Sequence, residues 1–406
     1  MLPVDQYGKR RKFLLILGDG MADEPLRELG GLTPLEYAKT PNMDAIAREG
    51  RMGSLRTVPH GYEPGSDVAN LSVIGYDPVN CYTGRGPLEA ASMGVTLAPD
   101  DIAYRCNLVT IQDGIMEDFS AGHISSEEGR ALFEALADAL PEIDLYPGVS
   151  YRNLLIAHRS EGATTVPPHD IVGEDVASSL PKGPDAELLR RCMEVSREIF
   201  AGHPVNQKRL ERGLRPATSI WPWSGGKTPS LLPFYMKFGL KGGIISAVDL
   251  LFGIARLAEM EVIRVPGATG FLDTDYEAKI RYALDALKSL DFVYVHVEAP
   301  DEAGHLGSIE EKVRAIERLD EVIGIALDEF DGTIALLPDH PTPIHLRTHT
   351  ADPVPFAILG KGKDRTERYS EREAKKGSLG LMRGPDLLPL LFSRKTLEED
   401  SDWLRF

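Results

Sequence analysis

The sequence predicts an α/β fold with a doubly wound, mostly parallel sheet and an inserted α+β domain. In the first and last parts of the 406-residue chain, short apolar runs alternate with longer helical patterns. This alternation is typical of a parallel sheet covered by helices on both faces. The middle of the chain holds short strand patterns interrupted by proline and glycine. We therefore expect a core of residues 1–100 and 213–406, with residues 101–212 as the inserted domain.

Buried strands are predicted where apolar residues follow one another and end at a loop. These runs are Phe13–Leu17, Gly243–Ala247, Phe292–Val297 and Thr333–Leu337. Helical patterns cover residues 248–260, 275–290 and 308–330. Two further helices are expected to start at Thr33-Pro34 and Thr40-Pro41, because a threonine cap followed by proline favours a helix start.

The middle segment gives a different set of elements. Strands are predicted at Ala103–Ile111 and Tyr151–Ala157, an amphipathic helix near residues 125–139, and a polar helix from about residue 184 to 200. This mixture of short strands and separate helices is what predicts an α+β insertion.

Composition and charge restrict the partners that we expect. The net charge of −17 argues against a nucleic-acid or anionic-membrane partner, since these need a basic surface. A small phosphorylated substrate is still compatible with this negative net charge. No stretch approaches the ~18 apolar residues of a membrane span, and three widely spaced cysteines suggest reduced thiols. We expect a cytoplasmic protein, with monomer and homo-oligomer both open.

Polar residues that follow the predicted strands suggest a metal centre. In a doubly wound sheet, ligands bind at the carboxyl ends of the strands. Each residue alone could be a helix cap or a packed histidine, but together they exceed what one catalytic metal needs. Two metals suit in-line displacement at phosphorus. The six residues are Asp19, Asp301, His305, Asp339, His340 and His349.

Ser66 is the candidate nucleophile of this site. It lies in a Pro64-Gly65 turn that enters an apolar helix. A helix N-terminus stabilises a phosphate group, and a metal lowers the pKa of a coordinated hydroxyl. From the residues alone, Ser66 is equally compatible with a plain N-cap.

Several segments together resemble a known family, the archaeal-type cofactor-independent phosphoglycerate mutases of the alkaline phosphatase superfamily. The resemblance runs essentially end to end. The segments are ILGDGMAD (16–23), PGSDVANLSVIGYDP (64–78), YTGRGPLEA (82–90), PDEAGH (300–305), PDH (338–340) and THTADPVPF (348–356).

The resemblance implies roles for the candidate residues. One metal would be held by Asp19, Ser66, Asp339 and His340, and the other by Asp301, His305 and His349. Ser66 would take the phosphoryl group and return it to the neighbouring hydroxyl. The metals would be Mn²⁺, Zn²⁺, Mg²⁺ or Co²⁺, and no 2,3-bisphosphoglycerate would be needed.

The inserted domain would then close as a lid that binds the substrate. The substrate-binding candidates are His123, Arg152, His169 and Asp170 in this domain, and Arg85 in the core. Arginine suits phosphate and carboxylate through its bidentate fork. A surface ion pair is the alternative role for each arginine.

The segment 215–227 departs from the family pattern. The family leads us to expect an arginine in a Leu-Arg-Gly-Ala-Gly turn, where this chain has Trp223. Either Trp221 and Trp223 pack the lid against the core, or a charge that contacts the substrate is lost. The variant resembles a bacterial branch proposed to act as homoserine kinase, although the chain has no phosphate-binding loop of the Walker type.

The main prediction is a phosphoglycerate mutase that interconverts 2- and 3-phosphoglycerate through a phosphoserine. The alternatives are a homoserine kinase-like phosphotransferase, a metal-dependent phosphatase, and a non-catalytic, metal-stabilised interaction protein.

Overall fold

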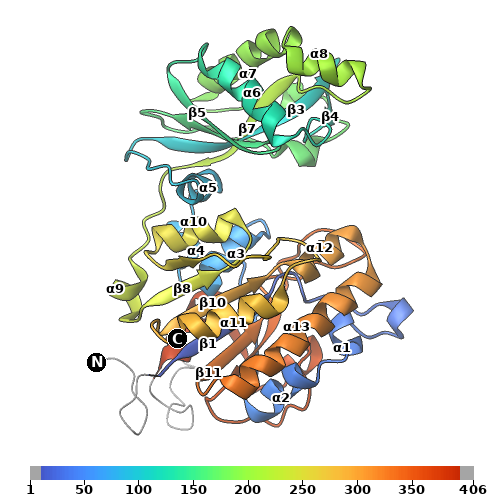
Figure 1. The fold of residues 1–406 in the computed structure, drawn as a ribbon, viewed down its shortest axis with the longest axis vertical. Coiled ribbons are helices and arrows are strands. Elements are labelled where there is room, and N and C mark those ends of the chain that lie inside the picture. Colours follow the sequence, from blue (N-terminus) through green and yellow to red (C-terminus); the bar gives the residue numbers. More distant parts are fainter. Residues whose placement is uncertain (1–10, 394–406) are drawn as a thin grey trace. The chain divides into compact units, whose positions relative to one another are not determined.

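The chain folds into two compact units in the computed structural model, which describes residues 11–393. The first unit contains the described residues up to Tyr82 and those from Leu231 onward, and the second contains Thr83–Ser230. Figure 1 shows a sheet and a set of helices in each unit. The second unit extends beyond the insertion that we expected at 101–212, because an N-terminal helix and a C-terminal strand pack with it.

The first unit is built on an eight-stranded sheet in the described part of the chain. β1 lies inside it and pairs in parallel with both β10 and β11. β12 runs antiparallel to β11 and β2, so the sheet is mostly parallel, as predicted. In spatial order the strands are β13 (Leu381–Arg383), β2 (Arg51–Arg56), β12 (Val354–Leu359), β11 (Thr333–Leu337), β1 (Phe13–Gly18), β10 (Phe292–Val297), β8 (Gly242–Ile245) and β9 (Glu261–Ile263).

Four of these strands are the predicted apolar runs, and every residue of each is buried. β8 is shorter than the predicted run because the hydroxyl of Ser246 accepts a hydrogen bond from the Val248 amide (3.0 Å), which turns the chain into the next helix.

Helices cover both faces of this sheet. On one face, α2, α11 and α13 pack against the strands through a cluster that includes Leu14, Val293 and Ile316. On the other, the rings of Phe13 and Phe292 contact Phe392. The helices are α1 (Pro34–Tyr37), α2 (Pro41–Glu49), α3 (Ser66–Val73), α4 (Pro78–Cys81), α9 (Phe234–Phe238), α10 (Asp249–Leu257), α11 (Tyr276–Ala286), α12 (Ala299–Leu306), α13 (Ile309–Glu329), α14 (Glu371–Ala374) and α15 (Leu387–Phe392), with 3₁₀ turns at Arg27–Leu29 and Gly384–Asp386.

The two threonine caps differ in the structure. Thr33 forms a full capping box with Glu36 at the start of α1. Thr40 precedes α2, but its side chain makes no cap hydrogen bond, so that part of the prediction is wrong. The carboxylate of Asp320 from α13 takes its place, accepting from the Met43 amide at 2.7 Å. A tertiary contact therefore replaces the local cap.

The second unit contains a five-stranded antiparallel sheet with helices packed on it. α7 is amphipathic, not merely polar as expected, because Leu189, Cys192, Met193 and Phe200 are buried in the core of this unit. The elements are α5 (Gly86–Ser92), β3 (Ile102–Gln112), β4 (Ile115–Asp118), α6 (Ser126–Ala137), β5 (Ile143–Val149), β6 (Arg152–Ala157), α7 (Ala186–Ala201), α8 (Pro204–Glu211) and β7 (Ser219–Gly226), with 3₁₀ turns at Pro168–Ile171 and Val176–Ser179.

The two ends of the second unit show why its borders lie outside the predicted ones. β7 pairs with β3 along most of its length. Gly86 lies so close to β3 that a Cβ atom there would be 2.0 Å from the carbonyl oxygen of Ala103. Strand pairing and this backbone approach place α5 and β7 in the second unit.

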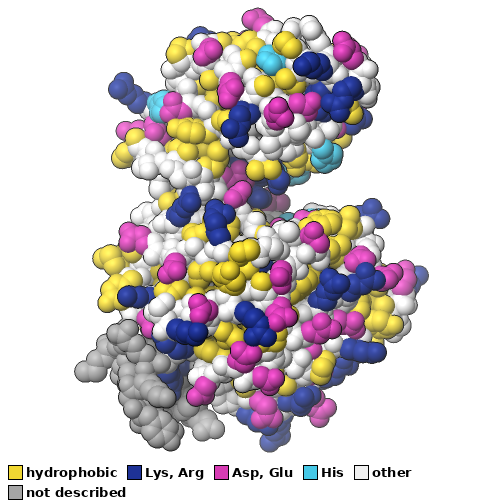
Figure 2. All heavy atoms as spheres, viewed as in Figure 1, with side chains coloured by type: hydrophobic (Ala, Val, Ile, Leu, Met, Phe, Trp, Pro, Cys, Tyr) yellow, Lys and Arg dark blue, Asp and Glu magenta, His cyan; other side chains and the backbone are white. Residues whose placement is uncertain are grey.

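Within residues 11–393, no helix combines the length and apolar character needed to cross a membrane. Basic and acidic side chains are interspersed over the face that Figure 2 shows. The expected absence of nucleic-acid and membrane partners stays a prediction.

A buried polar cluster fixes the loop that follows β1. Lys312 forms an ion pair with Asp23 (2.8 Å), and both side chains are fully buried. Glu371 accepts hydrogen bonds from the Asp23 amide (3.1 Å) and the Thr33 hydroxyl (2.8 Å). Burial raises the pKa of Glu371 to about 7 from its usual 4.5.

This raised pKa predicts a pH-dependent contribution to stability. The folded chain holds a proton on Glu371 that the unfolded chain releases, so this contribution is complete below pH ~4.5 and is lost as the pH rises to ~7. The change corresponds to about 3 kcal/mol. Between pH 5 and pH 7.5, the free energy of unfolding in urea should fall less in Glu371→Gln than in the wild type. In Glu28→Gln, which changes an exposed site, it should fall as much as in the wild type. Equal losses in all three proteins would contradict the assignment.

Candidate metal centre

The carboxyl ends of β1, β10 and β11 meet at one edge of the sheet. Gly18 at the end of β1 pairs with Val297, and Leu17 pairs with Leu337. The chain continues from these three ends into Asp19, helix α12 and Asp339. Parallel pairing therefore delivers the predicted polar residues to the same place.

One group of possible metal ligands contains Asp19, His296 and Asp339, all buried. The Nε2 atom of His296 lies 2.9 Å from Asp19 Oδ2. Asp339 is held by the Gly20 amide, which donates to its Oδ1 atom at 3.2 Å. Gly20 has a φ of +58°, and a Cβ atom there would be 2.5 Å from Asp301 Oδ1. Glycine is thus required where the backbone approaches the carboxylates.

The second group contains Asp301, His340 and His349. Asp301 and His305 are four residues apart on α12 and face the same side. His305 Nε2 lies 3.2 Å from Asp301 Oδ2 and 2.9 Å from His349 Nε2. His349 Nε2 lies 3.5 Å from Asp301 Oδ1. The hydroxyl of Thr342 donates to the same Asp301 oxygen.

His340 lies between the two groups. Its Nε2 atom is 3.4 Å from Asp19 Oδ1 and 3.5 Å from Asp339 Oδ2, and its ring centroid is 4.0 Å from that of His349. The resemblance assigned His340 to the same metal as Asp19 and Asp339, and its position is compatible with a ligand of either group.

Ser66 is the first residue of α3, and Gly65 is the N-cap. The plain N-cap role for Ser66 is therefore wrong. Its Oγ atom lies 3.1 Å from His340 Nε2. The side-chain amide of Asn70 donates both to the Ser66 carbonyl and to Asp339 Oδ2, each at 2.8 Å. This amide connects the serine helix directly to a possible metal ligand.

The electrostatics of the site show a concentration of negative charge. Burial raises the pKa of Asp19 well above its usual value, and the charges of Asp339 and Asp301 raise it further. Burial also raises the pKa of Asp301, but hydrogen bonds with His305 and His349 outweigh this and hold it well below its usual value. Burial lowers the pKa of His296 to about 3, so its imidazole is neutral.

These residues fit divalent cations. Asp19 Oδ1 is buried and has no hydrogen-bond partner among the described residues. Such an oxygen is costly to bury unless a cation or donor satisfies it. Neutral imidazoles and ionised carboxylates are the ligands that Zn²⁺, Mn²⁺ and similar ions use.

Sequence reasoning missed His296, Asn70 and Thr342. His296 is inside β10, not after it, and its only signal is a polar residue within a buried apolar strand. Asn70 lies four residues after Ser66 on α3, and Thr342 lies two residues after His340. All three residues form hydrogen bonds with candidate metal ligands that are distant in the sequence, and sequence spacing does not reveal such hydrogen bonds.

The second unit brings four of its five candidates into one cluster of basic and aromatic side chains. The fifth, Asp170, forms an ion pair with its neighbour His169 (3.6 Å), and both residues are exposed. We call the cluster that contains the other four candidates the basic–aromatic cluster. Its residues are Arg85, Glu89, Arg105, Phe119, His123, Tyr151, Arg152, His169 and Trp223.

Ring contacts connect the members of this cluster. The ring of His169 lies 5.2 Å from Trp223 and 6.1 Å from Phe119. Phe119 is 5.7 Å from Tyr151, whose ring also contacts His123 at 6.2 Å. Residues far apart in the sequence thus share one surface of this unit.

The tryptophans of the departing segment pack within the second unit itself. Trp221 donates its ring N–H to the carbonyl of Val166 (2.8 Å), and Trp223 donates to Asn107 Oδ1 (2.9 Å). Both rings belong to the hydrophobic core of this unit. Where the family pattern leads us to expect an arginine, Trp223 lies under the guanidinium of Arg105 at 4.3 Å.

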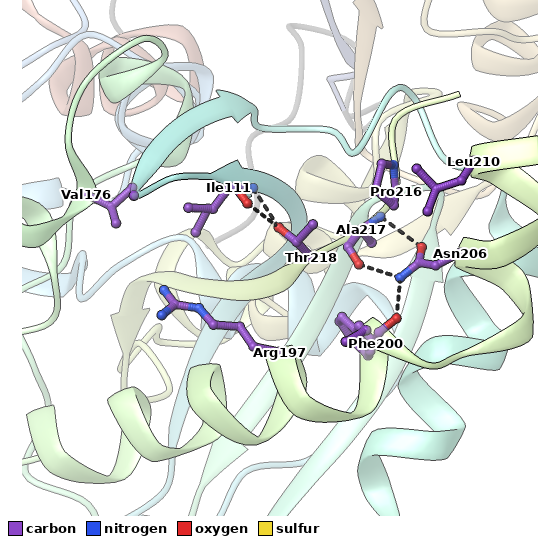
Figure 3. A pocket seen from close by; sticks show the side chains of 11 residues that line it. Ile111, Val176, Arg197, Phe200, Asn206, Leu210, Pro216, Ala217 and Thr218 are labelled. Atoms are coloured by element: carbon purple, nitrogen blue, oxygen red, sulfur yellow. Dashed lines mark hydrogen bonds between the residues drawn. The ribbon is translucent and has the colours of Figure 1, made fainter. Parts of the chain in front are cut away.

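A separate cavity of about 430 Å³ lies between α7, α8 and the sheet of the second unit. Figure 3 shows that the Asn206 amide and the Thr218 hydroxyl are already bonded within the protein. None of the predicted site residues lines this cavity.

The architecture and the residues at the sheet edge define a class: an α/β protein with a helix-borne serine beside a candidate metal centre. Comparison with known proteins supports this class. The family described as 2,3-bisphosphoglycerate-independent phosphoglycerate mutase matches residues 47–206. A protein of that name from Methanothrix thermoacetophila is 52% identical over 390 residues, which cover 94% of this chain and 100% of that protein. One from Methanosarcina mazei is 51% identical over 393 residues, covering 94% and 99%.

Solved structures give the same result. A protein from Pyrococcus horikoshii has a TM-score of 0.82 at 34% identity, covering 96% of this chain and 97% of its own. The cofactor-independent phosphoglycerate mutase from Thermoplasma acidophilum has a TM-score of 0.65 at 28% identity, covering 94% and 98%. The chain belongs to the family of 2,3-bisphosphoglycerate-independent phosphoglycerate mutases, and the predicted family and fold class are confirmed.

His296 should affect metal affinity, because it orients Asp19 through its Nε2 atom. Removing a group that orients a ligand typically weakens binding 10–100-fold. We therefore expect His296→Asn to lower Mn²⁺ affinity at least about tenfold in calorimetric titrations. His158→Asn, at a half-exposed site in the second unit, serves as control. An unchanged affinity in His296→Asn would show that His296 only fills space.

Proposed function

We propose that this chain is a cofactor-independent phosphoglycerate mutase that interconverts 2- and 3-phosphoglycerate through a phosphoserine at Ser66. The single observation that carries this proposal is the position of Ser66 Oγ, 3.1 Å from His340 Nε2, where the two groups of possible metal ligands adjoin. Family membership and the names of the close relatives support the same reaction.

The reaction needs no co-substrate. Ser66 Oγ forms a bond to phosphorus while the bond from phosphorus to the substrate oxygen breaks. The released hydroxyl gains the proton that the serine loses, and the reverse transfer goes to the neighbouring oxygen of the same glycerate. Atoms and charges balance without water or nucleotide.

Two divalent cations would be held by Asp19, His296, Asp339, His340, Asp301, His305 and His349, with Ser66 beside them. Bound there, they would neutralise phosphate charge and favour the serine alkoxide. Mn²⁺, Zn²⁺, Mg²⁺ and Co²⁺ all suit this ligand set.

The chain's own groups perform the remaining tasks. Asn70 fixes the Ser66 helix against Asp339, and the N-terminus of α3 presents amide groups to the transferred phosphate. We propose that the basic–aromatic cluster of the second unit binds the rest of the substrate. A mutase must also keep its phosphoserine from water, which a lid provides.

The proposed nucleophile can be tested directly. Ser66→Ala should reduce the conversion of 3- to 2-phosphoglycerate with Mn²⁺ by at least about 1000-fold, since the covalent step is lost. Ser289→Ala, at an exposed position, should retain full activity. ³¹P NMR distinguishes 3-phosphoglycerate from 2-phosphoglycerate and measures the amount of each.

A parallel assay separates the alternatives. Homoserine and ATP replace the phosphoglycerate under otherwise identical conditions. Wild-type protein that forms O-phosphohomoserine and leaves 3-phosphoglycerate unchanged would overturn the mutase assignment, and so would net release of inorganic phosphate without isomerisation.

A further inference from the structure

The cavity between α7, α8 and the sheet of the second unit is large enough for a small molecule. Its volume of about 430 Å³ lies within the range of small-molecule sites. At the density of liquid water, this volume corresponds to about fourteen non-hydrogen atoms. Small residues leave the space open. Ala201 ends α7 with only a methyl group, and no atom lies within 4 Å of the position that a Cβ atom of Gly114 would take.

The wall of this cavity is mainly apolar, and it comes from the second unit alone. Phe200 and Ala217 are fully buried and Val176 is nearly so, whereas Leu210 leaves 61% of its surface exposed. An apolar hollow that is open to water is unfavourable, and a ligand with an apolar body that fills it gains free energy from the surface that it covers.

The donors of the polar side chains in this wall are already used, as Figure 3 shows. The Asn206 amide donates to the carbonyls of Phe200 (2.8 Å) and Ala217 (2.7 Å). The Thr218 hydroxyl donates to the carbonyl of Ile111 (3.0 Å) and accepts from the amide of the same residue (2.6 Å). Neither side chain therefore has a donor left for a polar group of a ligand.

Arg197 is the exception among the polar residues of the wall. It is exposed and lies one helical turn before Ala201, so that the two residues share the face of α7 that lines the cavity. Figure 3 shows its side chain extending from α7 toward Ile111 and Val176. Among residues 11–393, its guanidinium has no ion-pair or hydrogen-bond partner. A free guanidinium beside an apolar hollow matches a ligand whose apolar body carries one anionic group.

We propose that this cavity binds a small apolar monocarboxylate of about ten to fourteen non-hydrogen atoms. Its hydrocarbon part lies against Phe200 and Ala217, and its carboxylate binds Arg197. Burial of hydrocarbon surface supplies most of the affinity, and the charge-assisted hydrogen bonds to the guanidinium select an anion over a neutral or cationic head group. This site is separate from the proposed reaction, because none of the predicted site residues lines the cavity. Its test is therefore independent of the mutase assignment.

Three probes that share one straight hydrocarbon chain test the proposal. Octanoate, 1-octanol and octylammonium carry a negative, a neutral and a positive head group. Their affinities are measured by NMR titration of the full chain with labelled methyl groups. We expect octanoate to bind at least about fivefold more tightly than 1-octanol, and octylammonium to bind most weakly. The methyl signals of Ile111, Val176 and Leu210 should shift on binding, whereas those of Leu14 and Val293 in the core of the first unit should not.

Two substitutions separate the two parts of the site. Arg197→Gln should weaken octanoate at least about fivefold and leave 1-octanol unchanged. Arg191→Gln, on the same helix with 61% of its side chain exposed, should change neither affinity. Ala201→Phe places a ring in the cavity from the exposed end of α7 and should weaken both probes at least about tenfold.

Four results would each overturn the proposal. They are the absence of octanoate binding, equal affinities for octanoate and 1-octanol, an unchanged octanoate affinity in Arg197→Gln, and unchanged binding of both probes in Ala201→Phe. A shift of the Leu14 and Val293 signals in place of those of Ile111 and Leu210 would show that the probes bind elsewhere, and it would overturn the proposal as well.

Discussion

The parallel pairing of β1 with β10 and β11 is the constraint on which the rest of the structure depends. Parallel strands end at the same edge, so the chain must leave three neighbouring strands beside one another. The carboxylates that follow are thereby brought close together in a buried place, where their charges repel. Burial and this repulsion together raise the pKa of Asp19. The fold supplies this unfavourable arrangement, and a bound cation would make it favourable.

Much of this arrangement could be predicted because it follows from strand ends. Asp19 and Asp339 each come one residue after a predicted apolar run, and Asp301 and His305 are one helical turn apart. The strand positions were right to within two residues for the same reason, since a buried parallel strand is a continuous apolar run.

The remaining features depend on contacts that sequence spacing does not encode. His296 supports Asp19 from inside a strand, where a polar residue gives no periodic signal. The helix after Thr40 is capped by Asp320, which is 280 residues away in the numbering, and local cap rules cannot identify it. Likewise, Arg105 contacts Trp223 and Glu89 only because β3 and β7 pair in the fold, and its sequence neighbours do not indicate these contacts. The borders of the second unit depended on β7 pairing with β3, a long-range pairing of the same kind.

One side-chain amide connects the two halves of the candidate chemistry. Asn70 donates to the backbone of Ser66 and to the carboxylate of Asp339, and Tyr294 donates to its oxygen from β10. Helix α3 is therefore attached, through Asn70, to the carboxylate of Asp339, which is also a possible cation ligand. Asp339 is thus both a possible cation ligand and one of the two side chains, with Tyr294, that hold Asn70 against the sheet. Any shift of this carboxylate on cation binding would be felt by the helix that carries the serine.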